Sequence, residues 1–216
     1  HSMTDIAIVD YGMGNLRSVH KAIEHVAPTA SVVVTDDPKV VEKAGRVVVP
    51  GQGAMPNCMQ ELISRGLRDA VIEAAKHKPF LGICIGLQML FEESEEGHVK
   101  GLNILPGKVV HFPAAAMSAP DGQKLKVPHM GWNQVYQVAE HPLWEGIAKD
   151  ARFYFVHSYY VEATNTASIA AQSNYPFPFT CAVAKDNIFA VQFHPEKSHT
   201  AGLTLLGNFA RWTPRF

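Results

Sequence analysis

The chain has 216 residues, of which 47% are hydrophobic and 18% are charged, and its formal net charge is −1. This composition suits one substantial globular domain and excludes intrinsic disorder. No block of Lys or Arg offers a surface for nucleic acid or anionic lipid, and no apolar run is long enough to span a bilayer. We therefore expect neither a nucleic acid nor a membrane as a partner.

The termini and the cysteines indicate a compartment. No basic segment followed by an apolar stretch opens the chain, so we expect no secretion signal. The two residues before Met3 resemble the remnant of a cleaved tag, which leaves 3–216 as the predicted domain. Cys58, Cys84 and Cys181 form no CxxC pair, and their odd number fits free thiols in a reducing cytoplasm.

The first half of the chain alternates apolar runs with helical spacing. Short apolar runs predict strands at residues 5–11, 31–35, 46–49 and 79–83. Helical patterns predict a first helix capped by Asn15, a short one after the DDP sequence at 36–38, a long one over 56–76 interrupted near Gly66, and another over 87–93. Nearly continuous apolar strands between helices predict a parallel α/β sheet covered on both faces.

The second half is richer in short strands separated by turn residues. Strands are predicted at residues 108–112, 132–138, 152–156, 159–163, 168–172, 180–184 and 188–193. Residues 113–126 are rich in Ala, Pro, Gly and Ser and predict a surface loop, and a last helix is expected over 199–212. The fold class is therefore α/β in a single domain, with a central mixed, mostly parallel sheet flanked by helices and an antiparallel extension.

Cys84 is the candidate nucleophile. It stands in the sequence GICIG at residues 82–86, between a predicted buried strand and a predicted helix, which is the form of a nucleophile elbow. Glycines two residues on either side would permit the strained turn, the helix N-terminus would favour the thiolate, and the Ile85 N–H would be free to stabilise an oxyanion. Taken alone, the pattern leaves open a small buried cysteine in a glycine-rich turn.

His194 and Glu196 are the candidate base and its orienting acid. The sequence His-Pro-Glu follows the apolar strand predicted at 188–193, so the histidine falls at a strand end, where α/β sheets place their sites. An extended backbone around Pro195 would point both side chains the same way. A surface turn with a solvated carboxylate is the alternative for this sequence alone. No HxxxH or CxxC spacing is present, so we expect no metal and no cofactor.

Three sequence blocks together resemble the class I, triad-type glutamine amidotransferases, a flavodoxin-like family. They are GICIGLQ at 82–88, FHPE at 193–196 and the sequence PGQG at 50–53, which is similar to the oxyanion strand of that family. Further blocks resemble the glutaminase subunits of imidazole glycerol phosphate synthase, which act in histidine biosynthesis. These are DYGMGN at 10–15, FEESEEG at 91–97, PHMGWN at 128–133 and FVHSY at 155–159.

The resemblance implies a reaction and a set of site residues. L-Glutamine would be hydrolysed to glutamate and ammonia by the triad of Cys84, His194 and Glu196. Backbone groups of Ile85 and of the segment with Gly51 and Gln52 would form the oxyanion hole. The residues expected to bind glutamine are Gly53, Gln88, Glu96, Ser158 and Tyr159. Of these, Gln88 also follows from spacing, since it lies four residues after Cys84 on one helix face.

The resemblance also implies a partner. The chain has no room for an acceptor domain, so ammonia would pass to a cyclase subunit with a (β/α)₈ barrel, in a heterodimer. That subunit would make imidazole glycerol phosphate and aminoimidazole carboxamide ribotide. The candidates for the docking face are Asn15, Trp132, Tyr154 and Lys197. Alternatives are a subunit for anthranilate, pyridoxal phosphate or guanylate synthesis, a hydrolase or stress protein with an elbow cysteine, and a silent flavodoxin-like module.

Overall fold

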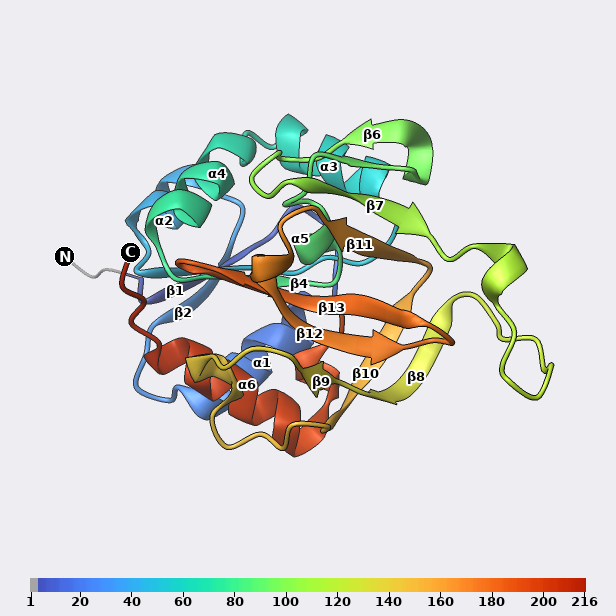
Figure 1. The fold of residues 1–216 in the computed structure, drawn as a ribbon. Coiled ribbons are helices and arrows are strands. Elements are labelled where there is room, and N and C mark those ends of the chain that lie inside the picture. Colours follow the sequence, from blue (N-terminus) through green and yellow to red (C-terminus); the bar gives the residue numbers. More distant parts are fainter. Residues whose placement is uncertain (1–3) are drawn as a thin grey trace.

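A mixed β-sheet forms the centre of the molecule in the computed structural model, which describes residues 4–216 (Figure 1). The expected tag remnant lies outside the described residues. The strands of this sheet are β1 (Ile6–Val9), β2 (Val32–Thr35), β3 (Arg46–Val49), β4 (Phe80–Ile83), β5 (Glu93–Ser94), β6 (Val99–Lys100), β7 (Gly107–His111), β9 (Tyr136–Gln137), β11 (Tyr159–Ala163), β12 (Ile169–Asn174), β13 (Pro178–Lys185) and β14 (Ile188–Val191). Their order is β2-β1-β3-β4-β14-β13-β11-β7-β5-β6, and β12 pairs with β13 and β9.

The parallel half of the sheet consists of β2, β1, β3, β4 and β14. All four residues of β1, β4 and β14 are buried, as expected for strands with helices on both faces. The sequence-based prediction of a parallel α/β sheet is thus confirmed. From β14 the sheet continues through antiparallel pairs to β13, β11 and β7, which confirms the predicted extension.

Helices cover both faces of the sheet. The α-helices are α1 (Leu16–Val26), α2 (Pro38–Lys43), α3 (Met55–Ser64), α4 (Arg68–His77), α5 (Ile85–Gln88) and α6 (His199–Arg211). Helices α2, α3 and α4 lie on one side of the sheet, whereas α1 and α6 pack together on the other (Figure 1). Short 3₁₀ turns are η1 (Glu96–His98), η2 (Ala114–Ala116), η3 (Pro142–Trp144), η4 (Thr166–Ser168) and η5 (Pro195–Lys197). Of these, η2 lies in the predicted loop at 113–126.

Helix boundaries follow local signals in three cases. The Asp37 carboxylate accepts a hydrogen bond from the backbone of Lys39 at 2.9 Å and starts α2 as predicted. Gly66, with φ of +72°, separates α3 from α4 in the left-handed conformation that commonly ends helices. Asn15 is the N-cap residue of α1, as predicted, but its side chain makes no capping hydrogen bond.

The prediction of a helix over residues 87–93 was wrong. Helix α5 starts at Ile85 and ends at Gln88, and the chain then turns into β5. The apolar residues after α5 instead bond to a returning segment: the Met89 carbonyl accepts from Leu102 N at 2.7 Å, and the Leu90 carbonyl from Ile104 N at 2.9 Å. These partners are distant in sequence, so helical spacing could not reveal the competition.

Strand β8 (His129–Gln134) and strand β10 (Arg152–His157) form a separate antiparallel ribbon. The strand predicted at 132–138 is therefore divided between β8 and β9, and the strand predicted at 152–156 leaves the central sheet. Among residues 4–216, no helix has the length and apolar character needed to cross a membrane.

Candidate active site

Cys84 occupies a strained turn between β4 and α5. Its backbone has φ of 58° and ψ of −109°, a conformation that L-residues adopt only when their surroundings impose it. The flanking glycines are required by packing. A Cβ on Gly86 would lie 1.9 Å from the Val49 carbonyl oxygen, and one on Gly82 would lie 2.7 Å from the Gly86 carbonyl oxygen. The sequence GICIG therefore folds as the predicted elbow.

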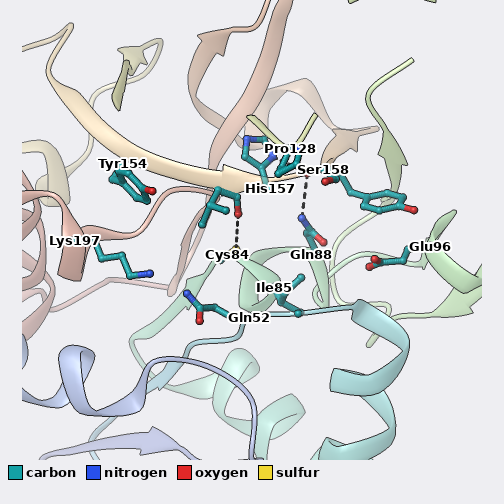
Figure 2. A pocket seen from close by; sticks show the side chains of 13 residues that line it. Gln52, Cys84, Ile85, Gln88, Glu96, Pro128, Tyr154, His157, Ser158 and Lys197 are labelled. Carbon is teal, nitrogen blue, oxygen red and sulfur yellow. Dashed lines mark hydrogen bonds between the residues drawn. The ribbon is translucent and has the colours of Figure 1, made fainter. Parts of the chain in front are cut away.

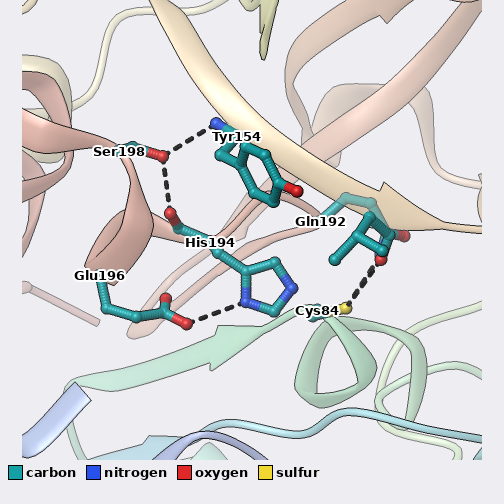
Figure 3. Close-up of polar contacts among 7 residues, drawn as sticks. Cys84, Tyr154, Gln192, His194, Glu196 and Ser198 are labelled. Carbon is teal, nitrogen blue, oxygen red and sulfur yellow. Dashed lines mark hydrogen bonds and ion pairs between the residues drawn. The ribbon is translucent and has the colours of Figure 1, made fainter. Parts of the chain in front are cut away.

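His194 and Glu196 follow β14, the strand directly beside β4. The imidazole Nδ1 lies 2.9 Å from Glu196 Oε2, and both side chains are 2% exposed (Figure 3). The predicted contact is present, but the extended backbone predicted to produce it is not. Pro195 starts the 3₁₀ turn η5 rather than continuing an extended segment, and this turn brings the carboxylate to the ring.

The His194 ring lies between Glu196 and Cys84 (Figure 3). Its Nε2 is buried without a hydrogen-bond partner among the described residues, so this nitrogen is open to a reacting group. Burial lowers the pKa of His194, but electrostatic attraction to the neighbouring Cys84 and the contact with Glu196 outweigh it. The pKa is raised to about 10. The protonated imidazolium is therefore the state of His194 that this environment favours.

The Cys84 sulfur has two further polar neighbours. The side-chain amide of Gln192 donates to it at 3.7 Å, and the sulfur lies 3.9 Å from the Val156 carbonyl oxygen (Figure 3). Gln192 was not predicted as a site residue. The sequence did carry a signal for it, which is a single amide in the apolar segment IFAVQF. Gln192 is fully buried, and a fully buried polar side chain requires a hydrogen-bond partner.

A second missed residue holds the backbone behind the imidazole. The Ser198 hydroxyl donates to the His194 carbonyl at 2.6 Å and accepts from the Tyr154 N–H at 2.9 Å (Figure 3). Ser198 thereby ties η5 to β10. A serine after His-Pro-Glu-Lys carries no signal in the sequence that separates this role from an ordinary turn residue.

A cavity of about 470 Å³ opens at Cys84 (Figure 2). Seven of the eight residues predicted to bind glutamine or to form the oxyanion hole line it: Gln52, Gly53, Ile85, Gln88, Glu96, Ser158 and Tyr159. Gln88 donates to the Tyr159 carbonyl at 3.2 Å, and one Glu96 oxygen accepts from Met55 N at 2.7 Å, at the start of α3. Glu96 therefore anchors a helix and faces the cavity, rather than lying on a solvated acidic face.

The predicted oxyanion segment packs beside the elbow. Ile85 is the first residue of α5, so its N–H has no intrahelical acceptor. The predicted oxyanion residue Gly51 is not among the residues that line the cavity, and a Cβ there would lie 2.1 Å from the Tyr11 hydroxyl oxygen. The buried Tyr11, which was not predicted as a site residue, thus leaves room only for glycine at position 51.

The four predicted docking residues are not all together. Tyr154 and Lys197 line the cavity mouth, and Trp132 contacts Tyr154 edge to face, with ring centroids 6.1 Å apart. Trp132 is 42% exposed and also stacks on His199. Asn15 does not line the cavity.

The other two cysteines are buried away from such chemistry. Burial raises the pKa of Cys58 to about 12 and raises that of Cys181 further. Cys58 lies in α3 and Cys181 in β13, as expected, and neither follows an elbow. Burial thus disfavours a thiolate at Cys58 and at Cys181.

The comparisons with known proteins agree with this geometry. The family "Glutamine amidotransferase class-I" matches residues 7–211, so the chain is a class I glutamine amidotransferase. The fold is similar to that of a putative GMP synthase protein from Thermoplasma acidophilum. The TM-score is 0.70 at 18% identity, covering 98% of this chain and 94% of that one. A crystal structure of another glutamine amidotransferase gives the same TM-score at 16% identity, covering 95% and 99%.

Curated relatives define the family more narrowly. The chain is 73% identical to the imidazole glycerol phosphate synthase subunit HisH of Nitrosospira multiformis, over 98% of this chain and all of the relative. Identity to the protein of the same name from Nitrosomonas europaea is 65%, again over 98% and 100%. Within its class, the chain belongs to the HisH subunits of imidazole glycerol phosphate synthase. This membership favours the histidine pathway over the other synthases weighed above.

Proposed function

We propose that the chain hydrolyses L-glutamine to glutamate and ammonia at Cys84. The observation that carries this proposal is the position of the cysteine. It stands on a strained elbow, in the lining of a cavity, beside a buried imidazole that a carboxylate holds at 2.9 Å. Nucleophile, base and orienting acid are the parts that acyl transfer from an unactivated amide requires.

The reaction begins with attack of the Cys84 sulfur on the side-chain amide carbon of glutamine. His194 holds the thiolate as an imidazolium and donates its Nε2 proton to the departing ammonia, leaving a γ-glutamyl thioester. A water molecule then attacks the thioester, His194 takes the water proton, and the sulfur leaves as glutamate is released. Glu196 keeps Nδ1 protonated throughout and so presents Nε2 to the reaction.

The tetrahedral intermediate needs donors for its oxygen. The Ile85 N–H supplies one, and a peptide of the Gly51–Gln52 segment supplies the second after a rotation that glycine permits. Removal of one such donor typically costs about 10²–10³ in rate. A donor that depends on a peptide rotation lets a partner control the reaction.

The cavity provides polar groups for both charges of the amino acid. The Glu96 carboxylate, with one oxygen on the α3 backbone, would receive the substrate ammonium, and the backbone at Ser158 and Tyr159 would receive the carboxylate. Gln88 and Gly53 line the same cavity.

The ammonia serves a cyclase subunit, which we propose to be a (β/α)₈ barrel in a heterodimer with this chain. The products there would be imidazole glycerol phosphate and aminoimidazole carboxamide ribotide. Trp132 and the neighbouring Met130 are 42% and 62% exposed, and together with Tyr154 and Lys197 they offer a docking face beside the cavity mouth. Asn15 is proposed at its edge. Three free cysteines favour the cytoplasm as the compartment.

The proposal is tested with Cys84→Ser in the synthase reconstituted with the cyclase. Glutamine-dependent product formation should be abolished, while ammonia-dependent formation should stay within twofold of the unmodified complex. Cys181→Ser is the matched control, because it also replaces a buried thiol and should retain both activities. Loss of both activities in Cys84→Ser, or retention of the glutamine-dependent one, would contradict the assignment.

A further inference from the structure

A continuous chain of hydrogen bonds runs from strand β8 toward the nucleophile. The Asn133 amide lies 3.1 Å from His129 Nε2, and His129 Nδ1 lies 2.9 Å from His157 Nε2. His157 Nδ1 lies 2.8 Å from the Tyr159 carbonyl oxygen. His129 and His157 are only 3% and 6% exposed, so these contacts exclude water.

The chain continues through two amides. The Tyr159 carbonyl also accepts from Gln88 Nε2 at 3.2 Å, and the same nitrogen lies 3.1 Å from Gln192 Oε1. The Gln192 amide nitrogen then donates to the Cys84 sulfur at 3.7 Å. Gln88 and Gln192 are 2% and 0% exposed.

The partners permit one set of proton positions. A carbonyl faces His157 Nδ1, so that nitrogen carries the proton and Nε2 accepts. His129 must then donate through Nδ1 and accept through Nε2. Asn133 fits this direction, because the same amide nitrogen donates to the Asn174 carbonyl at 3.0 Å and its oxygen accepts from Gln134 N at 2.8 Å.

Both histidines must be neutral for this arrangement. Burial lowers the pKa of His129 to about 4 and that of His157 to about 3, and for His157 the charges of His129 and His194 act in the same direction. The surrounding rings are aromatic: His129 stacks between Phe155 and Tyr175, with centroids 4.8 and 4.0 Å away.

We propose that His129 and His157 are positioning residues, which transmit the placement of strand β8 to the Tyr159 carbonyl and, through the two glutamine amides, to the Cys84 sulfur. The proposal deepens the proposed glutaminase function and rests on it. Two phenylalanines would fill an aromatic pocket without burying four ring nitrogens. The histidines instead join the exposed strand that carries Met130 and Trp132 to the nucleophile. A shift of that strand on docking would then alter the hydrogen bonds on the sulfur.

The first test needs no activity. In ¹⁵N-histidine-labelled full chain at pH 7, nitrogen chemical shifts should identify His129 and His157 as neutral Nδ1–H tautomers. A scalar coupling between the two ring nitrogens should report the N–H···N bond. A charged ring, or an Nε2–H tautomer at either residue, would overturn the proposed series of hydrogen bonds from Asn133 to Cys84, called the relay below. This outcome is independent of whether glutamine is the substrate.

The second test separates positioning from packing in the reconstituted synthase. His129→Phe keeps an aromatic ring but removes both hydrogen bonds, and we expect the glutaminase kcat to fall about tenfold with KM for glutamine within threefold. The matched control is His141→Phe. His141 is another histidine whose pKa burial lowers to about 4, but it packs on Phe189 and Trp212 and is absent from the relay. Its kcat should stay within twofold.

Asn133→Ala removes the first donor at a half-buried position and provides a variant that should fold even if His129→Phe does not. It should lower the glutaminase kcat about threefold and leave ammonia-dependent synthesis unchanged. Unchanged kcat in the relay variants, a loss confined to KM, or an equal loss in His141→Phe would overturn the proposal. If the unmodified synthase lacks glutaminase activity, the proposed function fails, and the nitrogen coupling still decides the relay.

Discussion

The Tyr11 hydroxyl donates a 2.5 Å hydrogen bond to the carbonyl of Pro50, the residue before Gly51. The same oxygen occupies the space that a side chain at position 51 would need. On the other side of the peptide, the Cys58 sulfur donates to the Gln52 carbonyl at 3.5 Å. The peptide between Gly51 and Gln52 therefore lies between two anchored carbonyls, which would confine any rotation to that bond.

This packing predicts that substitutions at Gly51 and Tyr11 change the free energy of unfolding non-additively. Gly51→Ala should lower the free energy of unfolding by about 1–3 kcal/mol through overpacking against Tyr11. Tyr11→Phe alone should cost about 1–3 kcal/mol, because the buried Pro50 carbonyl loses its donor. In the double variant the nearest tyrosine atom is the ring carbon at 3.4 Å, so the loss should be smaller than the sum by about 1 kcal/mol or more. Urea unfolding measures all three; strict additivity would contradict the contact.

Glu196→Gln should lower the glutaminase kcat by roughly 10²-fold or more, since an amide stabilises the imidazolium less and no longer fixes its tautomer. KM should change little, because Glu196 does not line the cavity. Steady-state kinetics of the reconstituted synthase measure both constants. Glu93→Gln, which alters an exposed glutamate paired with Lys100 at 3.9 Å, is the control and should leave kcat unchanged.

The raised pKa of His194 also predicts an alkaline loss of stability. Its folded value of about 10 lies above the ordinary 6.5, so the folded state binds the proton more tightly than the unfolded chain. The contribution is complete below pH 6.5 and is lost as the pH rises through about 10. Thermal unfolding between pH 7 and about 10 should show a smaller decline in Cys84→Ser, which removes the main cause of the raised pKa, than in the unmodified chain. An equal decline would contradict the charge pair.

Acid should destabilise the protein through its buried neutral histidines. Between pH 6.5 and about 4 the unfolded chain binds protons at His129 and His157 that the folded chain does not, so the free energy of unfolding falls as pH falls. Each histidine contributes up to about 1.4 kcal/mol per pH unit. Urea unfolding at pH 7, 6 and 5 should show a shallower dependence for His157→Gln, and an unaltered slope would exclude His157 as a source.

Alkylation should discriminate among the three cysteines. Brief treatment of the native chain with iodoacetamide at pH 7 should modify Cys84, whereas Cys58 and Cys181 should stay unmodified because burial raises their pKa and limits access. Peptide mass spectrometry gives the site, and the same treatment in urea should modify all three. Faster modification of Cys58 than of Cys84 would be inconsistent with the site.

Local signals in the sequence predicted much of the fold and the elbow that carries Cys84. Strand β3 and strand β11 have the predicted bounds, and the elbow glycines lie where a side chain would clash with backbone. These features depend on residues close in sequence, or on the burial of a whole strand, which a continuous run of apolar residues indicates.

Most of the failures come from partners that are distant in sequence, and one comes from a local turn. The helix predicted over 87–93 ends early because its carbonyls bond to residues 101–105. The contact between His194 and Glu196 was predicted, yet a 3₁₀ turn produces it rather than an extended backbone. Gln192 and the histidine pair escaped notice because their roles depend on side chains that the fold brings together from other strands.

The pairing of β4 with β14 has a practical consequence for the study of this protein. Ile83 and Val191 are neighbours in the ladder, and the Cys84 N–H donates to the Val191 carbonyl at 2.8 Å. The proposed nucleophile and base thus take their separation from two central strands about 4.8 Å apart, rather than from mobile loops. Opening of central strands generally coincides with global unfolding. The glutaminase rate that remains after exposure to heat or denaturant should therefore be proportional to the fraction of folded molecules. Catalysis can then serve as an assay of folding in crude preparations.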